Sequence, residues 1–197
     1  MILAATAILA CSMSVLAPPG DRAPSRRDYH VRTIDPRVRE WIDVGARESR
    51  TFNVLLNQLA ASDVIVYIQL VDRIPGGGDG HLFFVTSTRT ARYLRIELLG
   101  RGSRSQIISV LGHELQHAVE IASARWVKDN RAVSTLYRRV GDLSTRYESL
   151  DARMTGERVR YELATYQPAP ERSTAQDEGE RSRELHGDGS AAGCPSR

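Results

Sequence analysis

The sequence predicts an α+β fold in which helices at both ends of the chain pack on a small, mostly antiparallel sheet. Apolar residues recur at helical spacing within residues 36–59, 103–122 and 133–163. Between residues 63 and 98, by contrast, β-branched and aromatic residues gather in short runs. The chain of 197 residues, with 41% hydrophobic and 26% charged residues, is long enough for one domain with a sizeable core.

Residues 1–17 have the composition of a secretory signal peptide. The run from Ile2 to Ala17 is apolar or small, is too short to span a bilayer and is followed by Pro18. We therefore expect export to the periplasm, the membrane surface or the medium. The segment ending at Cys11 also resembles a bacterial lipobox, and a lipid anchor there is the only membrane contact that we expect. The alternative is ordinary signal cleavage, which removes Cys11.

Charge argues against one class of partner. The formal net charge is only +3, and the arginines are scattered among acidic residues rather than clustered on one face. We therefore expect no nucleic-acid binding.

Residues 18–35 are predicted to be a linker, because residues 21–28 are charged and contain Pro24. Residues 29–34 could pair as a short strand or stay irregular. The folded domain is expected to cover residues 36–165. Pro36 suits the first turn of a helix, and Ser49 suits the N-cap of a second helix.

Three strands are expected next. Asp63–Leu70 is a β-branched run and predicts a strand. The glycine-rich segment Ile74–Gly80 must be a loop. His81–Ser87 and Ala91–Leu98 predict two more strands, joined by a short turn as an antiparallel hairpin.

A long helix follows the sheet. Ser103 and Gln106 have the spacing of a capping box. One apolar stripe then follows the helical period: Ile108, Leu111, Leu115, Ala118 and Ala122.

Two further helices are expected towards the C-terminus. A short one is predicted around Val133–Val140, with Gly141 at its C′ position. A last helix is predicted over Ser144–Thr165. Residues 166–197 have no apolar period and predict a disordered tail, in which His186 is expected to be inert.

The long helix carries the motif that predicts chemistry, His113-Glu114-Leu115-Gln116-His117. Histidines four residues apart lie on one helix face, so their imidazoles can converge on one metal ion. Glu114 flanks that face and can accept a proton from a metal-activated water. Glu120 lies one turn farther on, where it suits an acceptor for a histidine N–H better than a ligand.

This motif resembles the zinc site of the zincin metallopeptidases. The order of helix, strands and motif helix over about Pro36–Thr165 is also similar to the N-terminal half of zincins, and to short exported bacterial proteins with such a core. The resemblance implies a minimal zincin-like core with Zn²⁺ as its cofactor. It further implies that part of Leu82–Ser87 or Tyr93–Ile96 lines a cleft for an extended peptide.

The resemblance also bears on the third zinc ligand. Where the metzincin pattern requires a glycine and a histidine, the chain has Glu120 and Ser123. In the gluzincin pattern the third ligand is a glutamate on a later helix, and the candidates are Glu148, Glu157 and Glu162. We favour Glu148, because Ala152 one turn on permits close packing against the motif helix.

These inferences predict a zinc metallopeptidase acting on peptides or proteins. His113, His117 and Glu148 would hold the metal, and Glu114 would be the general base. Four residues are alternatives for stabilising the oxyanion: Tyr147, Tyr161, Arg153 and His81. The rival hypothesis is an exported binding or interaction domain whose metal site is structural or inactive.

Overall fold

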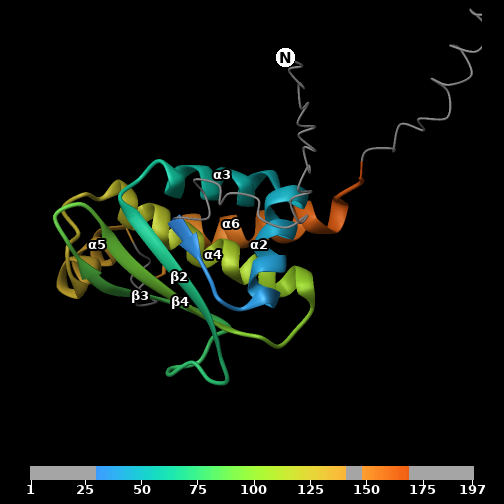
Figure 1. The fold of residues 1–197 in the computed structure, drawn as a ribbon, viewed down its shortest axis with the longest axis horizontal. Helices are drawn as coiled ribbons and strands as arrows, with labels where there is room; N and C mark the ends of the chain where they lie inside the picture. The colour runs from blue at the N-terminus through green and yellow to red at the C-terminus, as the bar shows by residue number, and fades with distance from the viewer. Residues whose placement is uncertain (1–29, 141–147, 169–197) are drawn as a thin grey trace, which may run out of the picture. The chain divides into compact units, whose positions relative to one another are not determined.

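The computed structural model describes residues 30–140 and 148–168 (Figure 1). The expected signal peptide of residues 1–17, Cys11, the linker up to residue 29 and the tail from residue 169 lie outside the described residues. The chain divides into two units between residues 164 and 165. All the described strands, and all the described helices apart from the last residue of the final one, belong to the first unit.

Two helices open the fold as predicted. Helix α2 spans Pro36–Glu48, and helix α3 spans Arg50–Ala60. Ser49 lies between them and caps α3, because its hydroxyl accepts a hydrogen bond from the Phe52 backbone N–H at 3.0 Å. The predicted N-cap is therefore confirmed.

The sheet is mixed, so the α+β class is confirmed but the expectation of mostly antiparallel pairing is wrong. Strands β1 (Val31–Arg32), β2 (Val64–Val71), β3 (Gly80–Ser87) and β4 (Arg92–Leu99) lie in the order β1-β2-β4-β3. The hairpin of β3 and β4 is antiparallel as predicted. However, β2 pairs in parallel with both β1 and β4.

The parallel pairing arises because β4 returns between β2 and β3. The loop after β2 carries the chain past one strand position, about 10 Å across the sheet. Its three consecutive glycines, Gly76, Gly77 and Gly78, have φ values of 87°, 88° and 93°, which other residues rarely adopt. Composition shows that such a loop exists, but it does not show which strands the loop separates.

The short strand β1 extends the folded region towards the N-terminus. Val31 is only 2% exposed and belongs to the hydrophobic core. Of the two alternatives for residues 29–34, pairing holds for Val31 and Arg32. The expected linker of residues 18–35 therefore overlaps the sheet.

One face of the sheet carries the core. Alternate residues of β2 and β4 are buried there, while their neighbours on the other face, apart from Leu99 at the end of β4, are partly or fully exposed. Helix α4 (Arg104–Ser123) packs on this buried face together with α2 and α3. The capping hydroxyl of Ser103 and four fully buried residues of the predicted stripe are confirmed: Ile108, Leu111, Leu115 and Ala118.

Arg92 fixes the C-terminal end of α4 on the sheet. This first residue of β4 is fully buried, and its guanidinium donates to the backbone oxygens of Ile121 at 2.6 Å and Ala122 at 2.9 Å. The same group pairs with Asp63 just before β2. A buried charge with a carboxylate partner and several acceptors is compensated, so it positions the helix that bears the motif.

Two helices follow α4. Helix α5 spans Asn130–Val140, and helix α6 spans Leu150–Thr165. Helix α6 begins later than predicted, because Glu148 and Ser149 are not helical. Gly141 and the first residues of the predicted helix, 144–147, lie outside the described residues. Among the described residues, no helix has the length and apolar character that crossing a bilayer requires.

The buried face of α6 consists of small residues. Ala152, Gly156 and Val159 face the interior, whereas Leu150 and Met154 are 61% and 51% exposed. The apolar period expected for this helix therefore gives a buried side chain at Val159, whereas Leu150 and Met154 remain exposed.

Candidate metal centre

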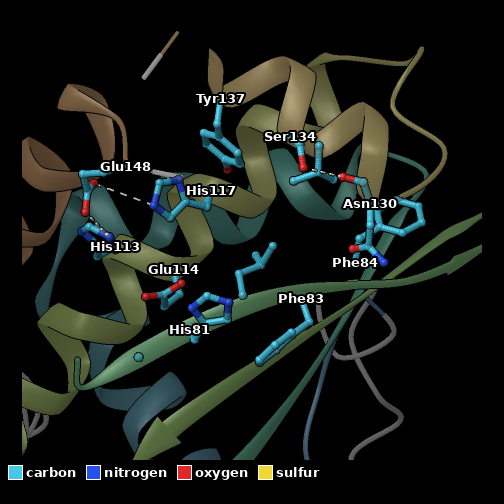
Figure 2. A pocket seen from close by; sticks show the side chains of 13 residues that line it. His81, Phe83, Phe84, His113, Glu114, His117, Asn130, Ser134, Tyr137 and Glu148 are labelled. Carbon is cyan, nitrogen blue, oxygen red and sulfur yellow. Dashed lines mark hydrogen bonds and ion pairs between the residues drawn. The ribbon is translucent and has the colours of Figure 1, made fainter. Parts of the chain in front are cut away.

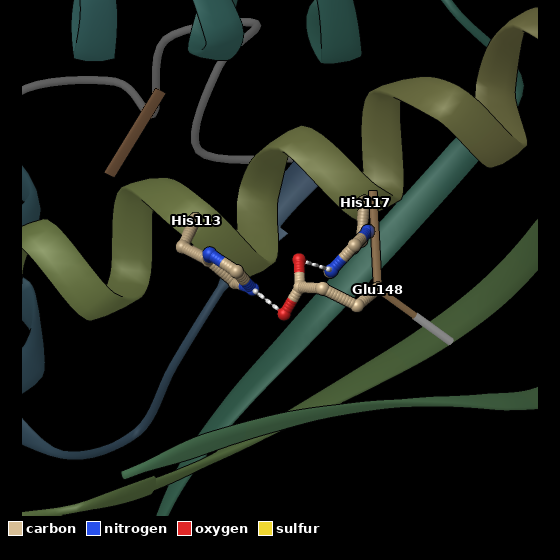
Figure 3. Close-up of side chains that lie close together, drawn as sticks. All are labelled: His113, His117 and Glu148. Carbon is tan, nitrogen blue, oxygen red and sulfur yellow. Dashed lines mark ion pairs between the residues drawn. The ribbon is translucent and has the colours of Figure 1, made fainter. Parts of the chain in front are cut away.

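Three predicted ligands meet beside α4 (Figure 3). His113 and His117 lie one turn apart on α4, with their ring centroids separated by 4.8 Å. Glu148 lies two residues before the start of α6. One of its oxygens is 3.6 Å from His113 Nε2, and the other is 3.9 Å from His117 Nε2. One ligand atom from each residue can be chosen so that all three lie within 4.8 Å of one another.

Close helix packing brings Glu148 to the histidines. A Cβ added at Gly156 of α6 would lie 3.3 Å from the Cβ of His113, and one added at Gly112 of α4 would lie 3.0 Å from Val159. Ser109 on α4 also donates a hydrogen bond to the Gly156 carbonyl oxygen at 2.8 Å. The two backbones therefore approach as small residues allow, which agrees with the packing expected around Ala152.

The donor set fits a zinc ion. Zinc favours imidazole nitrogen and carboxylate oxygen, and tetrahedral bonds of about 2.0–2.1 Å place neighbouring ligand atoms roughly 3.3 Å apart. The contacts of 3.6 and 3.9 Å at Glu148 involve its two different oxygens, and a set with one atom from each residue spans up to 4.8 Å, so the three side chains would have to move inward to hold one ion. His113 and Glu148 also keep about a quarter of their side-chain surface exposed, which leaves access for a further ligand.

Glu120 orients His117, as predicted for an acceptor behind the ligand. Its Oε2 atom lies 3.0 Å from His117 Nδ1. A proton on Nδ1 leaves the lone pair on Nε2 directed towards Glu148. Burial disfavours the charged form of His117, but the hydrogen bond to Glu120 and the nearby carboxylates outweigh it and raise the His117 pKa.

The pKa values of His113 and Glu120 are lowered, whereas the pKa of His117 is raised. Burial and the neighbouring His117 lower the pKa of His113, which keeps this imidazole neutral and able to bind a metal. Burial opposes ionisation of Glu120, but hydrogen bonds from His117 and Ser149 outweigh it and lower its pKa. The surrounding protein groups thus favour a neutral His113 beside an ionised Glu120.

Glu114 lies next to the ligands and is 6% exposed. Burial raises its pKa to about 7. Strand β3 passes directly over it, because a Cβ added at Gly80 would lie 2.9 Å from Glu114 Oε1. Glu114 is therefore an enclosed carboxylate poised to exchange a proton near neutral pH.

These residues line a cleft of about 430 Å³ (Figure 2). Helix α4 contributes His113, Glu114 and His117, while β3 and α5 form the two sides. Strand β3 is the edge of the four-stranded sheet and contributes residues 80–84. Of the two segments expected to line the cleft, the start of Leu82–Ser87 does so, whereas Tyr93–Ile96 lies on β4 within the sheet and does not.

Helix α5 supplies residues that the sequence did not identify as part of a site: Asn130, Val133, Ser134 and Tyr137. The Tyr137 ring contacts the edge or face of His117 in a T-shaped arrangement, with 5.2 Å between centroids. Burial and the neighbouring Glu120 raise the Tyr137 pKa, so the phenol keeps its proton. Tyr137 follows the apolar period of α5, and nothing in that pattern distinguishes a core tyrosine from one beside a histidine.

The other predicted candidates fall outside the centre. Glu157 is exposed, and Glu162 instead hydrogen-bonds Ser49 and Thr51 at the start of α3. Tyr161 and Arg153 are exposed and do not line the cleft, and Tyr147 lies outside the described residues. His81 is the one described oxyanion candidate that lines it.

The fold and the centre together define an α+β domain with a two-histidine, one-glutamate cluster in a cleft at the sheet edge. No family model matches the chain, and neither the curated proteins nor the solved structures compared with it include a match.

Proposed function

We propose that this protein is a zinc-dependent peptidase. The observation that supports this function best is a buried carboxylate, Glu114, beside the cluster of His113, His117 and Glu148 in one open cleft. A purely structural zinc site is normally closed by four protein ligands, whereas a catalytic one has three and an accessible position. A chance group of acidic side chains would not include two histidines placed one helix turn apart.

The residues of the chain have separate roles in this proposal. When bound, zinc supplies a Lewis acid that lowers the pKa of a coordinated water and polarises a carbonyl. Glu114 accepts a proton from the attacking water as the new carbon–oxygen bond forms. Glu114 then returns that proton to the amine nitrogen as the carbon–nitrogen bond breaks. Burial suits this role, because a pKa near 7 lets one group act as base and then as acid.

The sides of the cleft suit an extended peptide. Strand β3 has a free edge in the described sheet, and an extended backbone can pair with such an edge. His81 lies on this strand near Glu114 in Figure 2, where its N–H could donate to the developing oxyanion. Tyr137 on the opposite side is a second donor that keeps its proton.

The test is a comparison of wild-type protein with Glu114→Gln. Zinc per chain is measured by elemental analysis, and hydrolysis is followed on casein and on a mixed peptide library. We expect one zinc in both proteins, and activity in the variant lower by about 10²–10⁴-fold, the usual contribution of a general base. Glu157→Gln, which changes an exposed glutamate of α6, is the matched control and should keep full activity.

Two results would contradict the proposal. Wild-type activity in Glu114→Gln would show that Glu114 is not the general base. A wild-type protein that binds one zinc but cleaves nothing in the library would favour the rival hypothesis of a binding domain with an inactive site.

A further inference from the structure

We infer that Ser149 is a positioning residue of the metal centre, which holds the third ligand in register with the two histidines. The inference rests on the proposed function, because it concerns the same centre. It goes beyond the ligand set, since Ser149 binds no metal and acts only through Glu120 and Glu148.

The Ser149 hydroxyl makes two hydrogen bonds at once. It donates to Glu120 Oε1 at 2.6 Å and accepts from the Ala152 backbone N–H at 3.0 Å. The other oxygen of Glu120 lies 3.0 Å from His117 Nδ1. The N-cap of α6 is thus connected through one carboxylate to a ligand on α4.

The Ser149 backbone makes a third contact. Its N–H donates to Glu148 Oε1 at 3.0 Å, and this is the oxygen that faces His117 Nε2. Ser149 therefore contacts one candidate ligand, Glu148, directly and a second, His117, through Glu120. The residue is 4% exposed, so water competes little for these bonds.

The need for such a link follows from where the ligands come from. His113 and His117 share one helix, whose geometry sets their spacing. Glu148 precedes a different helix, so a shift or rotation of α6 would move it relative to both histidines. The hydroxyl of Ser149 resists this shift, because any displacement of the start of α6 breaks its bond to Glu120.

The chain contains a matched serine away from the centre. Ser49 caps α3 by accepting from the Phe52 N–H at 3.0 Å, and it donates to Glu162 Oε2 at 2.6 Å. It is 1% exposed. The local arrangement at Ser49 thus reproduces that at Ser149, but Glu162 contacts no predicted ligand. Equal substitutions at the two serines separate helix capping from ligand positioning.

The test uses Ser149→Asp and Ser49→Asp in the full chain. Aspartate is a good N-cap, so each helix keeps its first turn. An ionised aspartate cannot donate to the facing glutamate and repels it. Zinc affinity is measured by competition with a chromophoric chelator, and the visible spectrum of the Co²⁺-loaded protein reports the ligand geometry.

We expect Ser149→Asp to weaken zinc binding by at least about tenfold and to change the Co²⁺ spectrum, as loss of support for a metal ligand usually does. Ser49→Asp should leave affinity within about threefold of wild type, and Ser149→Thr, which keeps the hydroxyl, should do the same. Equal affinities for Ser149→Asp and Ser49→Asp would overturn the inference. A wild-type protein that binds no zinc would instead overturn the proposed function.

If circular dichroism shows that Ser149→Asp does not fold, the test moves to Ser149→Ala, Glu120→Gln and the double variant. Residues that act through one another give losses of affinity that are not additive. We expect the double variant to lose little more than Glu120→Gln alone. Fully additive losses would overturn the inference.

Discussion

The environment of Glu114 depends on a residue without a side chain. Gly80, the first residue of β3, lies so close to α4 that an added Cβ would be 2.7 Å from Val110 Cγ1 and 2.9 Å from Glu114 Oε1. A real Cβ atom essentially never lies this close to another heavy atom, so any larger residue at this position must displace one of its neighbours. The end of the glutamate is the more mobile of the two.

Gly80→Ala should therefore move the proposed general base without touching any of the three candidate ligands. We expect one zinc per chain as in wild type, and kcat/KM lower by about 10–100-fold, as a misplacement of roughly 1 Å can cause. Activity on a peptide substrate and zinc content together measure this. Gly100→Ala is the control, because its Cβ would meet only the end of Leu70, at 3.3 Å. Unchanged activity in Gly80→Ala would show that Glu114 has room to move.

Among the elements, α6 is attached to the rest of the domain by two serine–glutamate contacts. Near its start, Ser149 bonds Glu120 of α4. Near its end, Glu162 accepts from the Ser49 hydroxyl at 2.6 Å and from the Thr51 N–H at 2.9 Å, at the N-terminus of α3. A carboxylate at that position also meets the positive end of the helix dipole. Helix α6 is thus held by polar contacts as well as by its small buried face.

The Glu162 contact predicts how stability depends on pH. Burial opposes ionisation, but bonds from Ser49 and Thr51 outweigh it and lower the Glu162 pKa below its ordinary value of 4.5. Since the unfolded state then binds protons more readily, this carboxylate stabilises the fold above about pH 5.5. Its contribution disappears as the pH falls through 4.5 to the folded-state pKa.

Glu162→Gln should lower the free energy of unfolding by about 1–3 kcal/mol at pH 7, as expected for hydrogen bonds to a charged group. The difference from wild type should shrink steadily between pH 5.5 and 3, measured by urea unfolding. Glu157→Gln, at an exposed position of the same helix, should change stability by less than about 0.5 kcal/mol at every pH. A difference for Glu162→Gln that stays constant with pH would contradict this account.

Local patterns predicted the elements well and their assembly less well. The caps at Ser49 and Ser103 and the β-branched run of Asp63–Leu70 depend on neighbouring residues, so they can be recognised in a single sequence. The place of β4 between β2 and β3 depends on which distant segments pair, and no local pattern encodes that. The burial of Arg92 was equally hidden, because its partners lie about 30 residues away.

The candidate centre shows the same division. His113, Glu114 and His117 were predictable because one helix sets their spacing. A family resemblance indicated that a glutamate on a later helix is the third ligand, and the small Ala152 one turn on favoured Glu148 among the three candidates. Tyr137 and Ser149 were not foreseen, since each matters through a contact with another element.

For the molecule as a whole, the question is whether the metal holds the fold together or only completes its site. Among the described residues, the hydrophobic core draws on the sheet and on each of the helices α2 to α6, and it contains none of the three candidate ligands. A core of this extent does not require a metal, unlike the small domains that unfold without zinc. Zinc would nevertheless connect α4 to the start of α6, so removing it should loosen their contact.

We therefore expect chelation to abolish activity while the domain stays folded. A ligand present at 100 times its Kd stabilises the folded state by about 2.7 kcal/mol, which for a domain of this size corresponds to a fall in Tm of roughly 10 °C when it is removed. Far-UV circular dichroism at 25 °C should not change. Zn²⁺ should restore both Tm and activity, but Mg²⁺ should not, because it prefers an octahedral set of oxygen ligands.

Two variants decide whether the effect arises at this centre. Glu148→Gln removes the one proposed ligand that lies outside α4, so chelator should lower its Tm much less than that of wild type, whereas Glu157→Gln should respond as wild type does. Complete unfolding of the wild-type protein by chelator at 25 °C would instead make zinc structural and favour a binding domain. An equal response in Glu148→Gln would mean that α6 contributes no ligand, and that the two histidines bind the metal without it.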